Sequence, residues 1–423
     1  MAHEATGLSP AAIESARLRT RIVLFVSVAF GSTGHLAAAT VASIVGQALL
    51  GSAALSGAPG ATVVFGAAVG AIGLSSIMAR RGRRTGLTVG YLASVAGAVV
   101  ATAAVVLRSF PLLLLGTFAI GFGNASNNLS RYAAADLVGP SRRAVAIGFV
   151  VWGSTVGGIV GPSLVPIGEA IAPGLGLPDL AGPYLIPIVF VTIAALLTTL
   201  LLRPDPFALA HESTIHEPTG EPAVPVREIL MRPAVLAAVA ALIAGQATMV
   251  LIMTMTPLHL TAHNHSLGTV GVVISGHVFG MFALAPVSGW ITQRLGHLPT
   301  ILLGTVVLVV ASLLAGLAPP DSDAMLFVAL FLLGWGWNLG FVAGSAMLSS
   351  GVELAERARV QGVADAVIWT TSALASLGSG AVVAAAGFST LGFIGVAIVL
   401  APVWLLLQGR KAVAAGAGAA GAS

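Results

Sequence analysis

The stretch SSIMARRGRR, residues 75–84, joins two apolar segments and is the starting point for reading the fold. The segments before and after it, 59–79 and 86–107, are each about as long as the ~20 apolar residues that cross a bilayer as a helix. The loop between them is short and carries Arg80, Arg81, Arg83 and Arg84. Two membrane helices joined by a basic loop are therefore expected here.

Composition extends this interpretation to the whole chain. Of 423 residues, 57% are hydrophobic and 8% are charged, whereas soluble domains have about 25% charged residues. The core of a soluble protein cannot hold so much apolar surface, so the chain is expected to fold in a lipid bilayer. The net charge of +4 comes from short arginine-rich loops and offers no basic face for nucleic acid. The absence of cysteine excludes disulfides and thiolate metal sites.

Twelve apolar segments of membrane-spanning length follow one another along the chain. They cover residues 21–48, 59–79, 86–107, 110–133, 143–170, 183–202, 233–258, 267–292, 298–317, 323–349, 358–384 and 387–408. Backbone polar groups must be satisfied within each segment in lipid, so the segments are expected to be helices. The predicted fold is all-α, a polytopic membrane protein of 12 transmembrane helices.

The positions of the basic residues predict the orientation. If the N-terminus is cytoplasmic, all of the 19 lysines and arginines except Arg108 fall on the cytoplasmic side. This is the positive-inside pattern of membrane proteins. We therefore expect a multi-pass protein of the plasma or inner membrane, monomeric in the lipid, with both termini in the cytoplasm.

The two halves of the chain resemble each other. RIVLFVSVAFGSTGH at 21–35 aligns with RPAVLAAVAALIAGQ at 232–246, which places His35 opposite Gln246. MARRGRR and TQRLGHL align at nearly the same offset and place Gly82 opposite Gly296. A duplicated six-helix bundle is a common construction of alternating-access transporters, with the binding site near the midplane.

This repeat predicts the domain organisation. The N-terminal six-helix half covers 1–202, and the C-terminal six-helix half covers 233–408. Between them, residues 203–232 are rich in proline and charge and predict a flexible cytoplasmic linker. Residues 409–423 form a cytoplasmic tail.

SSIMARRGRR resembles the loop motif G-x-L-x-D-x-x-G-R-R that follows helix 2 in the major facilitator superfamily. Gly82, Arg83 and Arg84 match it, whereas Ser75 and Ala79 replace the leading glycine and the acid. In that family the loop gates the cytoplasmic side through charge contacts. The resemblance implies the major facilitator fold, with two pseudo-symmetric halves, and a transporter without enzymatic activity.

A second copy of the loop motif, GWITQRLGH, begins at Gly289 and also keeps Arg294 and Gly296. Together with Arg80 and the matching residues of the first copy, these positions form the predicted gating loops. In helix 5, GGIVGPSL at 157–164 partly matches the family's G-x-x-x-G-P motif, which is associated with antiporters.

Methionine and histidine recur at helical spacing in the seventh and eighth spans. Met249 and Met253 are four residues apart, as are His277 and Met281, so each pair shares a helix face. We call these four side chains the Met/His ladder. Thioether and imidazole groups suit Cu(I), and an intramembrane histidine is usually functional. Methionine is also a common filler of apolar cores, which is our interpretation of Met255.

The two spacings resemble those of the CcoA-like copper importers within the same superfamily, M-x-x-x-M in helix 7 and H-x-x-x-M in helix 8. That resemblance implies import of Cu(I) as the transported substrate, with no resident cofactor. A related branch takes up riboflavin. The alternative is therefore a transporter of an organic solute, such as riboflavin or a drug, including proton-coupled efflux.

Four further polar residues are candidates for the substrate cavity or for ion coupling: His35, Gln246, Asn338 and Asp365. His35 is either a proton carrier, since histidine titrates near neutral pH, or a packing residue. Asp365 either couples protons or pairs with Arg131 or a loop arginine.

Histidines also gather in the outer loop HLTAHNHS, where His259, His263 and His265 either collect metal or are simply solvated. A sensor or an enzyme is the remaining class of function. The sequence has no H-E-x-x-H spacing, P-loop or nucleophile elbow, which disfavours a membrane-embedded enzyme.

Overall fold

The computed structural model describes residues 10–50, 57–211, 224–263, 265, 267–319 and 322–403, and the regular structure of this part is entirely helical. The longer helices are α1 (Pro10–Leu50), α2 (Ala58–Arg81), α3 (Arg83–Val106), α4 (Phe110–Asp136), α5 (Arg143–Ile171), α6 (Gly182–Leu201), α9 (Pro233–Ala262), α10 (Leu267–Val278), α11 (Ala285–Leu295), α12 (His297–Leu317), α13 (Asp323–Ser350), α14 (Leu354–Ala386) and α15 (Ser389–Leu400). Short elements are η1 (Pro140–Arg142), η2 (Ala172–Leu175), η3 (Asp179–Ala181), α7 (Pro206–His211), α8 (Val226–Leu230) and η4 (Phe279–Ala283).

Each predicted span overlaps a helix of the structure. Over the described residues, nine helices are long and apolar enough to cross a membrane, and α10 to α11 form a further span bent by 44°. The two other predicted spans coincide with α4, which is interrupted by asparagines and Arg131, and with α15. The all-helical fold is confirmed.

Large apolar side chains cover the outside of the helices. Phe65 of α2 is 61% exposed, Ile159 of α5 63% and Leu377 of α14 72%. Apolar surface on this scale marks contact with a partner or a membrane, and its distribution along long helices indicates lipid.

The eighth span departs from the straight helix predicted over 267–292. A π-helical turn, η4, follows α10, and α11 begins after Leu284 with Pro286 in its first turn. Proline lacks an N–H and disfavours helical geometry in the preceding residue, so the chain bends here. The regular α-helical spacing expected from His277 to Met281 therefore ends at Val278.

The predicted linker 203–232 is partly helical, because it contains α7 and α8. Residues 212–223 and the predicted tail 409–423 lie outside the described part of the chain.

The helices gather into two compact units. Unit 1 comprises residues 1–139, 150–223 and 354–369, and unit 2 comprises 140–149, 224–353 and 370–423. The division runs through α5 and α14, so each unit includes the start of a helix from the other half of the sequence. The domain boundaries predicted from the sequence, at 202 and 233, assign all of α5 to the first half and all of α14 to the second, and so do not predict this exchange.

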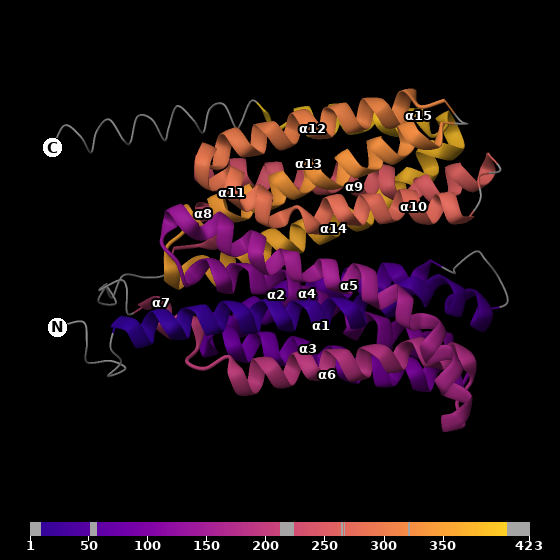
Figure 1. The fold of residues 1–423 in the computed structure, drawn as a ribbon, viewed down its shortest axis with the longest axis horizontal. Coiled ribbons are helices and arrows are strands. Elements are labelled where there is room, and N and C mark those ends of the chain that lie inside the picture. The colour runs from indigo at the N-terminus through magenta and orange to yellow at the C-terminus, as the bar shows by residue number, and fades with distance from the viewer. Residues whose placement is uncertain are drawn as a thin grey trace. The chain divides into compact units, whose positions relative to one another are not determined.

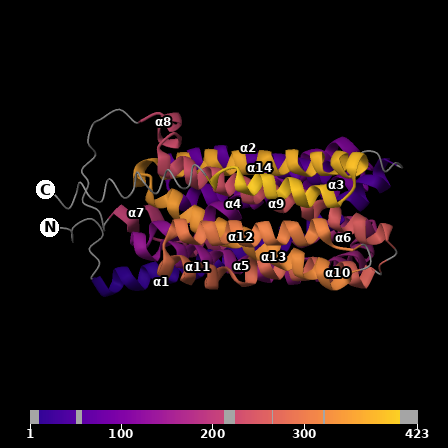
Figure 2. The same cartoon turned by 90° about the horizontal axis from the view of Figure 1, so that it is seen from above.

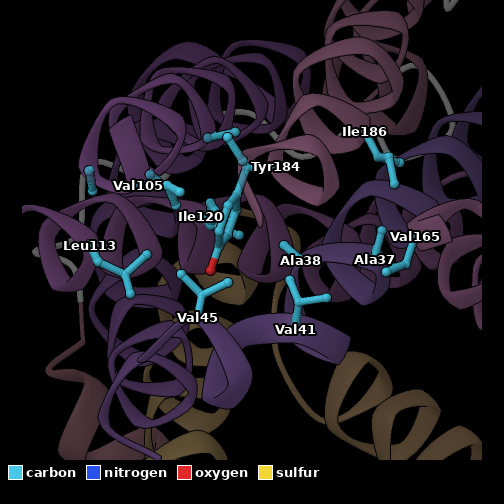
Figure 3. Close-up of a cluster of buried hydrophobic side chains, with 14 residues drawn as sticks. Ala37, Ala38, Val41, Val45, Val105, Leu113, Ile120, Val165, Tyr184 and Ile186 are labelled. Atoms are coloured by element: carbon cyan, nitrogen blue, oxygen red, sulfur yellow. The ribbon is translucent and has the colours of Figure 1, made fainter. Parts of the chain in front are cut away.

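In unit 1, α1 packs along α6, and α3 packs against α4 and α6 (Figure 1). Figure 3 shows Tyr184 of α6 directed toward Val41 and Val45 of α1 within the shared apolar core. A Cβ on Gly97 of α3 would lie 2.6 Å from the carbonyl oxygen of Gly116 on α4. Small residues permit such close approach of membrane helices.

In unit 2, α12 and α13 run side by side (Figure 2), and α13 also packs against α9 and α10. Ala237, Ala241, Ile301 and Ala343 form a buried core among α9, α12 and α13. Because α13 contacts both α9 and α10, it adjoins both spans that carry the Met/His ladder.

Candidate functional site

Gln246 of α9 lies at the centre of a buried polar group in unit 2. Its Nε2 donates to Ser372 Oγ of α14 at 2.9 Å, and its Oε1 accepts from Trp337 Nε1 of α13 at 2.7 Å. Gln246 is 4% exposed, so both hydrogen bonds are shielded from water. We call Gln246, Trp337 and Ser372 the polar triad.

Two aromatic rings pack against Trp337 of the polar triad. Trp337 stacks on Phe341, with ring centroids 4.5 Å apart and an interplanar angle of 20°. Phe282 of η4 meets the same indole edge-on at 6.0 Å. The triad therefore combines an amide and a hydroxyl with flat apolar faces, groups that can orient and stack an organic solute.

Met249 and Met253 share the α9 face of Gln246, because positions i, i+3 and i+7 fall on one side of a helix. Met249 is 5% exposed and Met253 is half-buried. The thioethers thus lie on the face that carries the polar triad.

His277 lies in the last turn of α10 and is fully buried. Its Nδ1 lies 2.8 Å from the carbonyl oxygen of Leu330 on α13. A carbonyl only accepts, so Nδ1 donates, and the lone pair of the neutral ring is on Nε2. Within the described residues, Nε2 is buried without a hydrogen-bond partner.

Met281 and Asn338 meet at the π-helical turn. Asn338 Nδ2 donates to the Met281 carbonyl at 2.7 Å, and this bond supports the irregular backbone of η4. Gly334 of α13 lies against His277 and Met281, because a Cβ there would be 2.9 Å from the Met281 nitrogen. His277 and Met281 are thus both held against α13, and their joint action with Met249 and Met253 remains a prediction.

His35 of α1 occupies the repeat position of Gln246 but has a different environment. Its ring is partly exposed, and its Nδ1 is buried with no hydrogen-bond partner among the described residues. The preceding Gly34 packs on Pro187 of α6, where a Cβ would lie 2.8 Å from the proline Cα. His35 therefore makes no counterpart of the polar triad in unit 1.

Asp365 pairs with Arg131 inside unit 1. Arg131 Nη2 donates to Asp365 Oδ1 at 2.6 Å and to the Tyr132 hydroxyl at 2.8 Å. Of the two roles that the sequence offered for Asp365, pairing is therefore present in the structure.

The first gating loop is anchored by Arg83 rather than by the exposed Arg80. Gly82 adopts φ +87°, a conformation that favours glycine, and turns the chain from α2 into α3. Arg83 is then buried and donates to Asp136 Oδ2 at 2.8 Å and to Gln361 Oε1 at 2.7 Å. Arg357 donates to the other oxygen of Asp136 at 3.2 Å. These residues form a buried charged clamp in unit 1.

Asp205 also holds this loop, and the sequence analysis missed its role. Its carboxylate accepts from the backbone N–H groups of Arg83 and Arg84 at 3.1 and 2.9 Å and from that of Phe207 at 2.8 Å. One side chain thereby caps α3 and α7 together. An aspartate directly before the proline that starts α7 is a capping signal that identifies half of this role.

The second gating loop has the same backbone and different partners. Gly296 adopts φ +91°, and Arg294 is exposed. Gly289 packs on the start of α5, where a Cβ would lie 2.7 Å from the Ala144 carbonyl oxygen. Nearby, Arg143 donates to the Ser349 carbonyl at 3.2 Å and to Ser350 Oγ at 3.0 Å. The sequence placed Arg143 in a charge cluster at the cytoplasmic edge but did not predict these two acceptors.

The outer histidines have local partners. His259 stacks on Phe388 at 4.2 Å and lies 4.4 Å from the His263 ring, and His265 pairs with Asp323. Within the described part of the chain, no group of three or more His, Cys, Asp or Glu side chains is arranged to hold a metal.

A bundle of long apolar helices with buried polar groups and two similar glycine-containing loops is the architecture of a multi-pass membrane transporter of small solutes. The chain belongs to the Major Facilitator Superfamily, whose pattern it matches over residues 22–267 and 237–421. It is a transporter and not an enzyme. Membership in this superfamily does not identify the substrate, and the relatives described next do not support copper import.

Two relatives align with nearly the whole chain. The uncharacterized MFS-type transporter YdeG of Bacillus subtilis is 34% identical over 407 residues, covering 95% of each chain. The riboflavin transporter RfnT of Brucella anthropi is 31% identical over 409 residues, covering 95% of this chain and 98% of its own.

Solved structures share the fold. The human organic anion transporter MFSD10 matches with a TM-score of 0.73 at 15% identity, over 94% of this chain and 100% of that chain. A bacterial homologue of the iron transporter ferroportin, in its outward-facing state, matches with a TM-score of 0.71 at 13% identity, over 93% and 99% of the chains.

Proposed function

We propose that the protein is an alternating-access secondary transporter of a planar heterocyclic solute of the riboflavin type. The polar triad carries this proposal, because it joins an amide, a hydroxyl and an indole in one buried group. The similarity to a riboflavin transporter over nearly the whole chain supports the same substrate class.

The chemistry of such a ring fits the triad. The isoalloxazine ring has carbonyl and imide groups along one edge, and the Gln246 amide can donate to one and accept from the other. The faces of the ring are apolar and favour stacking, for which Trp337 and Phe341 supply surface, worth about 0.5–1.5 kcal/mol per pair beyond burial. On binding, the solute would replace Ser372 and Trp337 as the hydrogen-bond partners of the Gln246 amide.

Uptake of labelled riboflavin into proteoliposomes tests the proposal. The Trp337→Leu variant is expected to lose most uptake, and Trp337→Phe to keep part of it, because the phenyl ring retains a stacking face. Trp290→Leu is the matched control, since Trp290 is 56% exposed on α11. Equal uptake by Trp337→Leu and Trp290→Leu would exclude the triad as the site.

Import of Cu(I) through the Met/His ladder is the second candidate, and one observation favours it. The lone pair of His277 Nε2 is buried, and its tautomer is fixed by the Leu330 carbonyl. A hydrogen bond of this kind to the second ring nitrogen is typical of histidines that bind metal. Met281, on the following turn, would supply a neutral thioether for the same ion.

Copper content separates the two candidates. If copper is the substrate, cells expressing His277→Ala or Met249→Leu accumulate less copper than cells expressing the wild type. Met231→Leu, which alters a methionine 60% exposed outside the spans, leaves accumulation unchanged. If the solute is a flavin, Met249→Leu leaves copper accumulation nearly unchanged, and Trp337→Leu lowers riboflavin uptake.

We also propose that both termini are cytoplasmic, in a plasma or inner membrane. The chain has no cysteine, so single cysteines report topology directly. Arg108→Cys is expected to react with an impermeant maleimide on intact cells, and Ser141→Cys only after permeabilisation. The reverse labelling pattern would show that both termini lie on the outer side of the membrane.

A further inference from the structure

Two histidines at the end of α9 lie side by side. His259 and His263 are four residues apart in the sequence, and their ring centroids are 4.4 Å apart at an interplanar angle of 53°. Residues at i and i+4 are neighbours on a helix surface. Two imidazoles that bind one ion at metal–nitrogen distances of about 2.0–2.1 Å have ring centres roughly 4.5–5 Å apart. The two rings are therefore close to the separation that a shared ion requires.

Contacts with the protein hold both rings and leave nitrogens for an ion. His263 Nδ1 lies 2.8 Å from the His259 carbonyl oxygen. Because a carbonyl only accepts, Nδ1 donates, and the lone pair of the neutral His263 ring is on Nε2. His259 stacks on Phe388 with ring centroids 4.2 Å apart and an interplanar angle of 15°. This stack uses the face of the His259 ring and leaves the nitrogens at its edge for other partners.

The surroundings of the pair favour a cation that enters from solvent. The apolar span of α9 ends at Leu260, and His263, which lies beyond it, is exposed. His265 donates its backbone N–H to the Leu260 carbonyl at 3.2 Å and pairs through Nδ1 with Asp323. Asp323 thus adds a carboxylate at the same end of unit 2, and negative charge attracts a cation to this surface.

We propose that His259 and His263 form a binding site for a divalent transition-metal ion of the Zn²⁺ or Cu²⁺ type. Imidazole suits both ions, and two histidines at i and i+4 on one helix face are a known zinc-binding spacing. The described residues contain no group of three or more His, Cys, Asp or Glu side chains arranged around a metal, so water completes the coordination and the ion exchanges with solvent. The site is separate from the Met/His ladder and holds for any solute, so it goes beyond the proposed function.

Electron paramagnetic resonance of the purified, tag-free protein with one equivalent of Cu²⁺ tests the site. Wild type is expected to show nitrogen couplings from two imidazoles, and His263→Ala from no more than one. His265→Gln is the matched control and keeps both couplings, and Met249→Leu keeps them because the ladder takes no part. Identical signals from wild type and His263→Ala would mean an adventitious ion only and would overturn the proposal.

Thermal unfolding with Zn²⁺ provides an independent measurement. An ion that binds only the folded protein stabilises it, so Zn²⁺ is expected to raise the unfolding midpoint of wild type and to leave that of His263→Ala unchanged. His259→Gln is the second variant, which keeps a planar group against Phe388, and is expected to behave like His263→Ala. An equal rise in wild type and both variants would contradict the site. Neither measurement uses riboflavin, so a failure of the proposed function does not affect the result.

Discussion

The two units place an arginine at the same position of the repeat and give it different acceptors. In unit 1, Arg357 at the start of α14 reaches Asp136 at the end of α4. In unit 2, Arg143 at the start of α5 reaches Ser350 at the end of α13. Arg143 and Arg357 are 214 residues apart, as are Asp136 and Ser350, and as are Gly82 and Gly296. The duplication therefore preserved the arginine and changed its acceptor.

This difference indicates that the two arginine contacts differ in strength. The unit 1 clamp is a buried ion-pair group, in which Asp136 is shared by Arg83 and Arg357. The unit 2 contact joins Arg143 to a hydroxyl and a carbonyl, which are neutral. Hydrogen bonds between two charged partners are stronger than those with one, so opening the unit 1 clamp is expected to cost more.

The largest expected effect follows removal of the shared acid. Asp136→Ala leaves two buried guanidiniums without their carboxylate and is expected to lower the free energy of unfolding by about 3–5 kcal/mol. Denaturant unfolding in detergent measures this. Asp323→Ala is the control, because the side chain of Asp323 is 52% exposed and surface ion pairs contribute at most about 1 kcal/mol. An unchanged unfolding midpoint for Asp136→Ala would show that the charged clamp does not stabilise the fold.

An intermediate effect is expected at the two loop glycines. Gly82→Ala and Gly296→Ala both force on alanine a positive-φ, extended backbone (φ 87°, ψ 164° and φ 91°, ψ 168°) that only glycine adopts readily, at about 1–3 kcal/mol. At Gly82 the new methyl group would also lie 2.7 Å from Asp205 Cγ, whereas at Gly296 the nearest atom is Pro299 Cδ at 3.9 Å. Thermal unfolding should therefore show the larger loss for Gly82→Ala. Equal losses would mean that the Asp205 cap adjusts freely.

The smallest effect is expected at the neutral contact. Ser350→Ala removes one hydrogen bond, and Arg143 keeps the Ser349 carbonyl, so the expected loss is about 0.5–1.5 kcal/mol. The same unfolding measurement compares it with Asp136→Ala. A loss as large as that of Asp136→Ala would refute the proposed inequality between the units.

The spans and loop glycines were predictable because they depend on local chemistry. A long apolar run in lipid has few alternatives to a helix, and the glycines of both loops recur at a fixed offset. Gly82 and Gly296 indeed share a positive φ. The repeat likewise pointed to Gln246, although its partners, Trp337 and Ser372, are distant in sequence.

The remaining contacts depend on packing that sequence patterns do not encode. His277 turns to the Leu330 carbonyl, and the π-helical turn at Phe279–Ala283 interrupts the spacing from which the Met/His ladder was predicted. Asp205 caps two helices from a segment that composition alone marks as linker. Arg143 and its acceptor Ser350 are 207 residues apart in the sequence.

Riboflavin binding by the purified protein tests the central claim most directly, because flavin fluorescence is quenched when the ring stacks on an indole. The account predicts saturable quenching with wild type and with Trp290→Leu, and little or none with Trp337→Leu. Undiminished quenching with Trp337→Leu, or none with wild type, would contradict a flavin-type site at the polar triad.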